Sequence, residues 1–409
     1  MNKLKDFVIS DYDYPLQEER IAKYPLENRD NSKLLFYKDG KIEEKVFYEI
    51  SEYLPESCLL VGNETKVIQA RLIFKKLTGA IIEIFCLEPV EPTAEVNLAF
   101  SQKKECVWKC FVGNNKKWKN GELLLEAVHN NEKIALKAEK LNSEGNAWNV
   151  RFSWTPESYS FSEILEVFGK IPLPPYLNRD AEDADLIRYQ TVFARNEGSV
   201  AAPTAGLHFT EKVFQKLDAK NIKRDYLTLH VGAGTFKPVS TDHIEEHEMH
   251  TEQVFVEVST IKLIKENLKA GVYPIGTTSV RTIESLFWHG AKLISGLQKE
   301  NYIDVKQWDP YSIEADQITV EDALQTIIDR MENDGIEFVK GATQLMIAPG
   351  YKYKVISGMI TNFHQPKSTL LLLVSALIGD DWKKVYNYAL DNDFRFLSYG
   401  DSCLFFKHD

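Results

Sequence analysis

Small, hydroxyl-bearing and imidazole residues crowd together in five stretches of the sequence, each beside a segment with strand character. The first stretch, residues 198–210, contains Thr204 and His208. Its glycines and alanines let a ligand approach the backbone, and Pro203 stiffens the turn. The helix expected to follow would present its N-terminal amides to an anion or a carboxylate. The pattern is typical of a binding loop, although an ordinary loop before a helix has the same composition.

The second stretch, residues 229–236, is a strand that runs into a glycine turn. Its Gly-x-Gly pattern suggests a dinucleotide-binding loop, but no third glycine completes the motif. Pro238 also stands where the helix of such a loop should begin. We therefore exclude a Rossmann dinucleotide site.

The third stretch, residues 243–252, holds the densest group of titratable side chains. His243, Glu246 and His247 match the inverted zinc-protease motif, and His250 would share their face of a helix. A zinc hydrolase is therefore one alternative. A solvated, acidic helix start is the plainer interpretation, and we favour it because short motifs often match by chance.

The fourth stretch, residues 276–284, reads as a strand end, a hydroxyl-rich turn and a helix that carries Arg281 and Glu284. Those two residues have the spacing of a helix-surface ion pair. A ligand site is favoured because α/β sheets bind ligands beyond strand ends. The fifth stretch, residues 360–370, is complemented by residues 394–401. Both place polar residues beside aromatic residues that can stack on a base.

The elements that must position these stretches suggest an α/β protein. Turn-punctuated short strands predict a small β-barrel or sandwich in the first half of the chain, at residues 80–87, 107–112, 123–128 and 148–154. After residue 175, helical and extended patterns alternate, which predicts an α/β domain with a largely parallel sheet. We expect a larger α/β domain built from residues 1–65 and 155–409, with residues 66–154 inserted as a small β-barrel domain. The acidic segment 290–340 looks inserted, and residues 321–333 within it form an amphipathic helix.

Composition narrows the class of protein. No apolar run approaches the length of a membrane helix and the N-terminus lacks the core of a signal peptide, so we expect a cytoplasmic protein. The five cysteines show no paired spacing, which favours buried, reduced thiols. The net charge of −11 weakens the case for nucleic-acid binding without excluding it. Residues 66–120 carry ten Lys or Arg residues against five Glu residues, which leaves room for one basic face.

Taken together and in this order, the stretches resemble the S-adenosylmethionine:tRNA ribosyltransferase-isomerases of queuosine biosynthesis. The resemblance spans nearly the whole chain. Its most specific motifs are GSVAAPTAGLHFT, LHVGAGTF, GTTSVR, TNFH and SYGD, supported by shorter matches near residues 14–30, 63–72, 172–176 and 189–191. The chain departs from the family pattern at Lys66, Gln69 and Gln365 and in the pair Gly79-Ala80. His243 lies outside the shared pattern, which undercuts the zinc alternative.

The resemblance implies an unusual reaction. The ribosyl part of S-adenosylmethionine moves to the aminomethyl group of a 7-deazaguanine at the wobble position of tRNA. It is isomerised to an epoxycyclopentanediol, which gives epoxyqueuosine and releases adenine and methionine. S-adenosylmethionine is then a co-substrate, no metal is needed, and the partner is tRNA that carries 7-aminomethyl-7-deazaguanine. We expect the protein to act as a monomer.

Roles for individual residues follow from the resemblance. Imidazole alone titrates unperturbed near pH 7, so acid–base work is assigned to His208 with Thr204 beside it, and to His247 and His250. The expected substrate-binding residues are His230, Gly232, Gly234, Thr235, Thr277, Thr278, Arg281, Asn362, Phe363, His364, Tyr399 and Asp401. Contacts to the tRNA backbone are expected from Arg71, Lys103, Lys104, Lys116, Lys117 and Lys119. A solvated surface explains these basic residues equally well. A tRNA-binding protein without catalysis is a further alternative.

Overall fold

The central sheet of the chain is built from strands whose side chains alternate between two hydrophobic cores. The computed structural model describes residues 8–230 and 244–408, apart from the side chains of Glu197 and His230. Leu59 and Val61 face one core and Leu60 faces the other, as the period of a strand requires. In order across the sheet, the six strands are β15 (Val272–Pro274), β3 (Leu59–Asn63), β13 (Lys223–His230), β14 (Glu252–Glu257), β17 (Phe338–Thr343) and β16 (Tyr302–Val305).

Strand direction in this sheet differs from the prediction. β15, β3 and β13 run parallel to one another. β14 pairs antiparallel with both β13 and β17, and β16 is parallel to β17. The expected largely parallel sheet is therefore mixed, because β14 lies antiparallel between β13 and β17.

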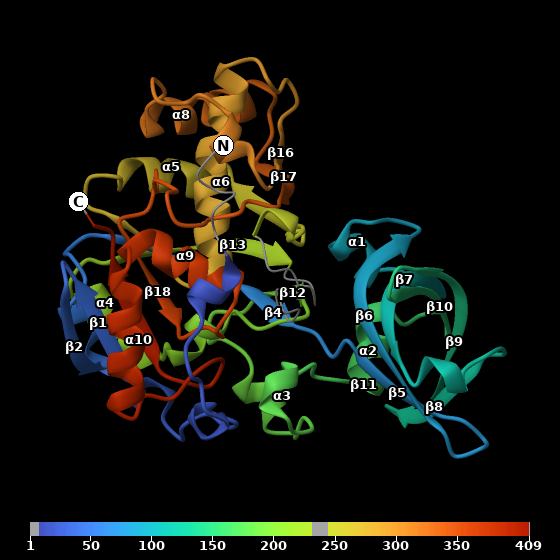
Figure 1. Ribbon diagram of the computed structural model, residues 1–409. Coiled ribbons are helices and arrows are strands. Elements are labelled where there is room, and N and C mark those ends of the chain that lie inside the picture. Colours follow the sequence, from blue (N-terminus) through green and yellow to red (C-terminus); the bar gives the residue numbers. More distant parts are fainter. Residues whose placement is uncertain (1–7, 231–243, 409) are drawn as a thin grey trace.

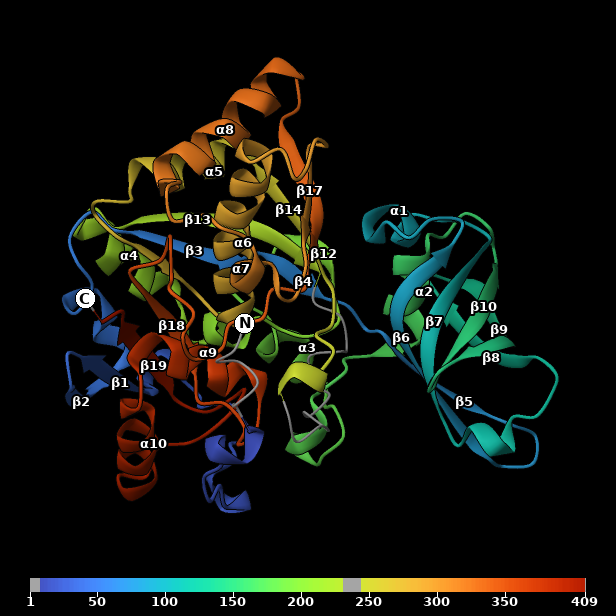
Figure 2. The same ribbon diagram turned by 45° about the horizontal axis from the view of Figure 1, so that its top comes forward.

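Helices pack on this sheet through their apolar faces. Figures 1 and 2 show α5 (Val258–Glu266), α6 (Thr277–Ile294) and α8 (Val320–Asn333) together over one face. The predicted amphipathic helix is confirmed as α8, which buries Leu324, Ile327, Ile328 and Met331 on one side. The helix expected after the first stretch is confirmed as α4 (Glu211–Ala219), whose first turn is capped by the hydroxyl of Thr210.

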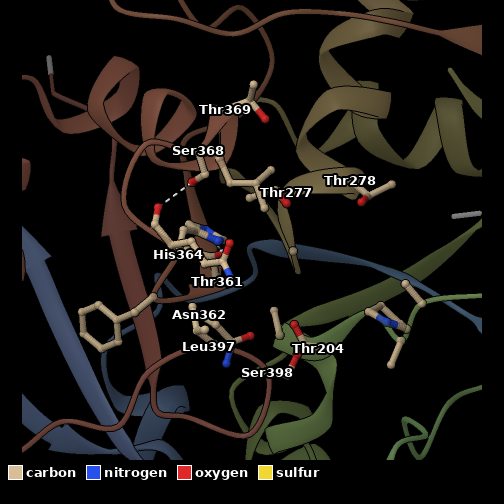
Figure 3. Close-up of a pocket in the computed structure, with 18 of the residues that line it drawn as sticks. Thr204, Thr277, Thr278, Thr361, Asn362, His364, Ser368, Thr369, Leu397 and Ser398 are labelled. Carbon is tan, nitrogen blue, oxygen red and sulfur yellow. Dashed lines mark hydrogen bonds between the residues drawn. The ribbon is translucent and has the colours of Figure 1, made fainter. Parts of the chain in front are cut away.

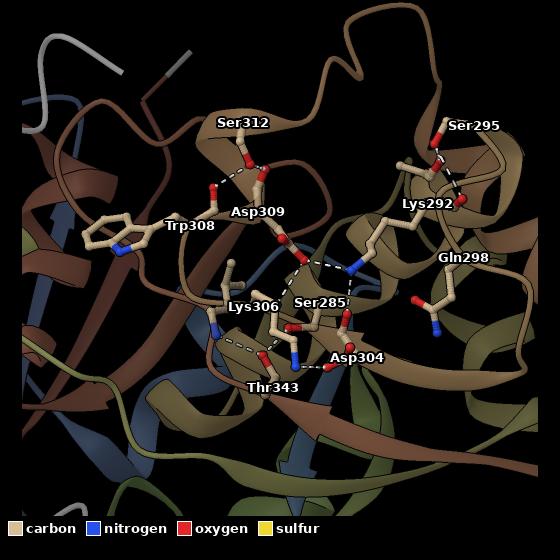
Figure 4. Close-up of polar contacts among 12 residues, drawn as sticks. Ser285, Lys292, Ser295, Gln298, Asp304, Lys306, Trp308, Asp309, Ser312 and Thr343 are labelled. Atoms are coloured by element: carbon tan, nitrogen blue, oxygen red, sulfur yellow. Dashed lines mark hydrogen bonds and ion pairs between the residues drawn. The ribbon is translucent and has the colours of Figure 1, made fainter.

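The acidic segment 290–340 is an integral part of this sheet. It supplies β16, the start of β17 and α8, and it also contains α7 (Asp309–Ser312). Figure 4 shows how polar contacts anchor it: Lys292 Nζ donates to the Asp304 carbonyl at 2.7 Å and pairs with Asp309 at 2.9 Å. The hydroxyls of Ser285 and Thr343 lie 2.7 Å apart, which ties α6 to β17. These contacts bury part of the segment's charge beside α6.

A second sheet of four strands meets the first at one point. Its order is β18 (Gly358–Asn362), β19 (Ser402–Phe406), β1 (Lys33–Lys38) and β2 (Lys41–Val46). A parallel bridge between Ile275 and Ile360 joins the end of β15 to β18. Asp39 and Gly40, both at positive φ, form the turn between β1 and β2. α9 (Thr369–Ile378) and α10 (Asp381–Asp391) pack nearby in the core.

The seven-stranded sheet lies to one side of these elements in Figures 1 and 2. Its order is β11 (Gly169–Lys170), β5 (Arg71–Lys75), β6 (Ile81–Glu91), β7 (Glu105–Gly113), β10 (Ala147–Thr155), β9 (Glu132–Glu144) and β8 (Leu123–His129). Within residues 71–170, all of which are described, no strand pairing joins β8 to the opposite edge. The sheet is therefore a curled, open half-barrel, whereas we expected a small β-barrel.

The core of this half-barrel extends past the expected boundary at residue 154. α2 (Phe161–Phe168) buries Phe161, Ile164 and Leu165 in it, and β11 pairs with β5. α1 (Val96–Phe100) also packs on this core. Cys106 and Cys110 lie on β7, and all five cysteines are buried and unpaired, as predicted.

The remaining short elements connect the two parts. β12 (Asn196–Ser199) pairs parallel with β4 (Thr65–Val67), and α3 (Asp185–Arg188) follows the proline-rich segment. No helix among the described residues is long and apolar enough to span a bilayer.

Candidate active site

A cavity lies where three strands of the two joined sheets end. Asn63 at the end of β3, Ile275 just after β15, and Thr361 near the end of β18 line it. β3 and β15 are parallel, and the Ile275–Ile360 bridge continues that direction into β18. The carboxyl ends of parallel strands are where α/β sheets leave room for ligands. Three of the five predicted stretches therefore meet here, through residues 201–205, 275–279 and 361–370.

Two helices begin at the wall of this cavity. α6 starts after Gly276, whose φ of 88° is a conformation that suits glycine, and Thr277 and Thr278 line the cavity. α9 starts after Ser368, whose hydroxyl accepts a hydrogen bond from the Leu371 amide at 3.2 Å. The first amides of a helix lack intrahelical acceptors and favour negative charge. The cavity thus has two places that suit a carboxylate or another anion.

Hydroxyl and amide groups from four segments surround the cavity. Figure 3 shows Thr204, Thr277, Thr361 and Ser398 among the labelled side chains around it. Thr204 begins the 3-10 helix η8 (Thr204–His208) of the first stretch. The lining is rich in donors and acceptors, which is what recognition of a nucleoside requires.

Three buried polar atoms in this lining lack a hydrogen-bond partner among the described residues: Oδ1 of Asn362, Oγ of Ser279 and the hydroxyl of Tyr189. A buried polar atom without a partner costs about 1–3 kcal/mol, so such atoms are uncommon in folded proteins. Asn362 and Ser279 are therefore suited to bond a ligand in the cavity.

His208 lies behind the cavity wall rather than in it. Nδ2 of Asn362 donates to Nε2 of His208 at 3.1 Å, and it also faces the Asp401 carbonyl at 3.4 Å. A carbonyl only accepts hydrogen bonds, which fixes the amide orientation. Nδ1 of His208 then carries the proton and donates to Oγ of Ser32 at 2.8 Å. Burial lowers the pKa of His208 to about 3, so the ring is neutral at pH 7.

His364 lines the cavity and is also neutral at pH 7. Burial lowers its pKa to about 3, and its Nε2 lies 3.0 Å from Oγ1 of Thr361. Its main chain is fixed, because the hydroxyl of Tyr386 accepts from its amide at 3.1 Å and the hydroxyl of Tyr14 donates to its carbonyl. The side chain is thus held rigidly beside the cavity.

Arg281 belongs to a buried charged cluster next to the cavity. Its Nη1 lies 3.0 Å from Oε2 of Glu252, and both side chains are almost fully buried. Glu252 also accepts from His250 at 3.3 Å and contacts Oγ1 of Thr278, a cavity residue, at 3.5 Å. Burial raises the pKa of Glu252, but the Arg281 guanidinium and the hydrogen bonds from His250 and Thr278 together outweigh burial and hold that pKa below its usual value.

The interpretation of Arg281 and Glu284 as a helix-surface ion pair is wrong. Both residues are buried, and Glu284 instead accepts hydrogen bonds from the Tyr351 hydroxyl at 2.7 Å and from the backbone amides of residues 354–356. The helix buries this face against residues 351–356, so i,i+3 spacing does not decide which partner each charge finds.

Residues 244–250 do not form the expected helical face. Residues 244–246 make one 3-10 turn, and no helix continues through residues 247–251. His247 is half-buried, and burial lowers its pKa. Among the described residues, no three His, Cys, Asp or Glu side chains are grouped as a metal site. His243 lies outside the described residues, as do Gly232, Gly234 and Thr235, and the side chain of His230 is also outside the description.

Three predicted substrate-binding residues have their side chains engaged elsewhere. The ring of Phe363 packs against Phe396 with centroids 4.6 Å apart, inside the main core. The hydroxyl of Tyr399 donates to Asp185 at 2.8 Å. The carboxylate of Asp401 accepts from the backbone amides of Lys33 at 3.0 Å and Arg395 at 2.7 Å. Asp401 thereby holds together two neighbouring segments behind the cavity.

The predicted tRNA-binding residues lie on or beside the half-barrel but not in one group. Lys103 and Lys104 precede β7, whereas Lys116, Lys117 and Lys119 follow it, and all five are exposed. A strand of this length spans roughly 30 Å. The lysines therefore form two groups at opposite ends of β7, and Arg71 lies apart from both on β5.

Several cavity residues were not predicted to bind substrate. They are Asn63, Tyr176, Tyr189, Ser279 and Ser398. Each lies in a motif that carried the family resemblance. The sequence therefore marked these residues as part of the family pattern but did not indicate that they line the cavity. Gln365, one of the departures from the family pattern, also lines the cavity.

Comparison with known proteins tests the resemblance that the motifs suggest. The family described as queuosine biosynthesis protein matches residues 9–405. The S-adenosylmethionine:tRNA ribosyltransferase-isomerase of Geotalea uraniireducens is 37% identical over 401 residues, which cover 96% of this chain and 98% of that protein. The protein of the same name from Halothermothrix orenii is 36% identical over 402 residues, which cover 97% and 99%.

A crystal structure of an S-adenosylmethionine tRNA ribosyltransferase from Thermotoga maritima is 27% identical, covers 97% of this chain and 99% of its own, and has a TM-score of 0.45. The relatives that are more than one third identical extend over almost the whole chain, as does the family match. The resemblance inferred from the motifs is therefore confirmed, and the chain belongs to the S-adenosylmethionine:tRNA ribosyltransferase-isomerase family of queuosine biosynthesis proteins.

Proposed function

We propose that this protein transfers and isomerises the ribosyl moiety of S-adenosylmethionine onto 7-aminomethyl-7-deazaguanine at the wobble position of tRNA. The products are epoxyqueuosine in tRNA, free adenine and methionine. The observation that carries the proposal is the meeting of three family motifs around one cavity with two helix N-termini. Members of the family that bear the ribosyltransferase-isomerase name extend over nearly the full chain.

S-adenosylmethionine would bind with its methionine carboxylate near the starts of α6 and α9. The unpaired amides of a helix N-terminus favour an anion there. Oδ1 of Asn362 and Oγ of Ser279, both buried and without a partner among the described residues, would bond polar groups of the nucleoside or of the deazaguanine. Thr204, Thr277 and Thr278 supply further hydroxyls at the same wall.

The chemistry needs a base for C5′, a proton for adenine and a neutral attacking amine. The sulfonium acidifies the C5′ protons, so a positioned base can remove one. Adenine leaves readily only when a proton reaches its ring. Burial holds His208 and His364 neutral, and an amine that loses its water in the cavity would likewise favour its neutral form.

His208 would act as a positioning residue in this scheme. Its Nε2 accepts a hydrogen bond from Nδ2 of Asn362, which leaves Oδ1 of the same amide pointing away from the His208 ring. His364, Thr204 and the pair His250–Glu252 are then the nearest candidates for proton transfer. His247 lies on the same segment as His250, directly after the 3-10 turn at residues 244–246.

The proposal includes the division of the chain expected from its sequence. Residues 66–154 would form a tRNA-facing domain inserted into a catalytic domain, and the packing of α2 and β11 favours including residues up to 170. The protein would work as a cytoplasmic monomer, with S-adenosylmethionine as its co-substrate and without a metal.

The test is to mix the purified protein with S-adenosylmethionine and tRNA that carries 7-aminomethyl-7-deazaguanine, and to measure free adenine and methionine. Release of both in equal amounts, dependent on the modified tRNA, supports the proposal. Tight binding of tRNA without adenine release would instead indicate a binding protein. Activity that is lost with a chelator and restored with zinc would favour the hydrolase alternative.

A matched pair of variants links the reaction to the cavity. Asn362→Leu keeps the size of the side chain and removes its amide, so it should slow adenine release by about fivefold to 150-fold, the cost of one unsatisfied buried group. Phe338→Leu changes a half-exposed residue on β17 and should leave the rate unchanged.

A further inference from the structure

A row of three side chains crosses the outer face of the half-barrel. Arg71 on β5 is the direct partner of Phe85 on β6, and Phe85 is the direct partner of Phe111 on β7. Direct partners in an antiparallel sheet project from the same face. Leu72 and Ile84, their neighbours along the strands, are buried in the core of the half-barrel. Arg71, Phe85 and Phe111 therefore form one row on the opposite, outer face.

A hollow of about 590 Å³ lies against this row. Glu83 of β6 also lines it, and the rest of the lining comes from the segment after β11, namely Pro172, Leu173, Pro174, Pro175, Asn178, Arg179 and Asp180. The hollow thus combines two aromatic rings, three prolines and two guanidinium groups. Flat apolar surfaces and guanidinium planes are what proteins use to stack on an unpaired nucleobase.

The Arg71 guanidinium is held flat within this hollow. Its Nε and Nη2 donate to the two carboxylate oxygens of Glu83 at 2.6 and 3.2 Å, and its Nη1 lies 3.6 Å from Asp180. Arg179 is likewise tied to Asp185 by two bonds of 2.7 and 2.8 Å. The Arg179 guanidinium already lies over the Tyr24 ring, 4.3 Å from its centroid. Arg71, fixed by its bidentate carboxylate, is the guanidinium that offers a face for stacking. Its positive charge is already neutralised, which disfavours a phosphate as the occupant.

The hollow and the candidate active site lie on either side of one short turn. The turn is the 3-10 helix η7 (Pro175–Leu177). Pro175 lines the hollow, whereas Tyr176 lines the cavity and has its hydroxyl 2.6 Å from Oγ of Ser398. A nucleotide that enters the cavity would therefore leave its neighbour in the same strand close to the hollow.

We propose that this hollow binds an unpaired nucleobase of the tRNA anticodon loop, stacked on the Arg71, Phe85 and Phe111 row, next to the nucleotide that is modified. The inference rests on the proposed function in taking tRNA as the substrate, and it adds a second base-binding site that holds the loop in register. The sheet face supplies the stacking surface, and the proline-rich segment closes over the base.

The experiment measures binding of tRNAs in which one anticodon-loop nucleotide at a time is abasic. One position beside the wobble nucleotide should weaken binding to the unaltered protein by about fivefold to 150-fold, the range for loss of one stacked base. In the double variant Phe85→Leu with Phe111→Leu, the same abasic tRNA should bind within about twofold of intact tRNA. Leucine keeps apolar bulk, and thermal unfolding checks that the variant is folded.

Phe338→Leu is the matched control, since it removes one half-exposed ring elsewhere and should keep the full abasic effect. Equal losses in the unaltered protein and the double variant at every loop position would overturn the inference. Adenine release by the unaltered protein is measured separately with intact tRNA. If adenine is released but the double variant keeps the full abasic effect, only the inference about the hollow is rejected. If the double variant loses the abasic effect but no adenine is released, only the proposed reaction is rejected.

Discussion

Removal of Arg281 should destabilise the protein in a way that depends on pH. The side chains of Arg281 and Glu252 are 3% and 2% exposed, and their charged atoms lie 3.0 Å apart. In Arg281→Met, the Glu252 carboxylate stays buried without its cation. The carboxylate can lose its charge only by binding a proton. At pH 7.5, protonation of a carboxyl group with the ordinary pKa of 4.5 costs about 4 kcal/mol.

We therefore expect Arg281→Met to lower the free energy of unfolding by about 4 kcal/mol at pH 7.5, which agrees with the 3–5 kcal/mol typical of a broken buried pair. At pH 5.5 the same proton costs only about 1.4 kcal/mol, so most of the deficit should disappear. The sign follows from Glu252, whose lowered pKa in the folded protein stabilises the fold above pH 4.5.

The assay is urea unfolding of the variant and the unaltered protein at both pH values. The double variant Arg281→Met with Glu252→Gln removes both charges and should recover about 2 kcal/mol relative to the sum of the single changes. Lys262→Met is the control, because its ion pair with Glu332 is half-exposed and should be worth less than about 1 kcal/mol. A deficit that is equal at pH 7.5 and 5.5 would refute the reasoning.

Three other expectations concern α6. Gly290→Ala should cost about 1–3 kcal/mol in urea unfolding, because the new Cβ would lie 2.3 Å from the Ala323 carbonyl oxygen; unchanged stability would contradict this packing. His289→Leu should flatten the acid instability: burial lowers the pKa of His289 to about 4, so the unfolded state gains a proton below pH 6.5 and the unaltered protein loses about 3 kcal/mol by pH 4. A variant with the original slope between pH 7 and 5 rejects that cause. Glu284→Leu should lower the melting temperature sharply, because the Tyr351 hydroxyl and three backbone amides lose their acceptor at about 1–3 kcal/mol each; a melting temperature within about 2 °C of the original speaks against it.

Local structure was readable from the sequence because its causes are local. The helix α8 follows from apolar residues at helical spacing, and the turn at Asp39-Gly40 follows from residues that tolerate positive φ. The N-terminal cap of α4 depends on one side chain, because the hydroxyl of Thr210 accepts a hydrogen bond from the backbone amide three residues later. The motif order likewise sufficed to recognise the family, because long motifs rarely match together by chance.

Sheet architecture was only partly readable. The strands of the half-barrel were expected, but whether their edges close depends on the curl of the whole sheet and not on any one strand. The same holds for the central sheet, where β14 returns antiparallel beside β13 although helices and strands alternate along the chain. The acidic segment reads as an insertion by charge, yet it completes this sheet.

The sequence by itself therefore determined the family, the elements and the polar stretches that belong to the site. Only the tertiary structure decided which of these side chains face the cavity. It placed Asn362 and His364 at the cavity wall and His208 behind it, and it gave Arg281 to Glu252 instead of Glu284. Such pairings join residues far apart along the chain, and they depend on strand order and helix rotation, which no local pattern of residues specifies.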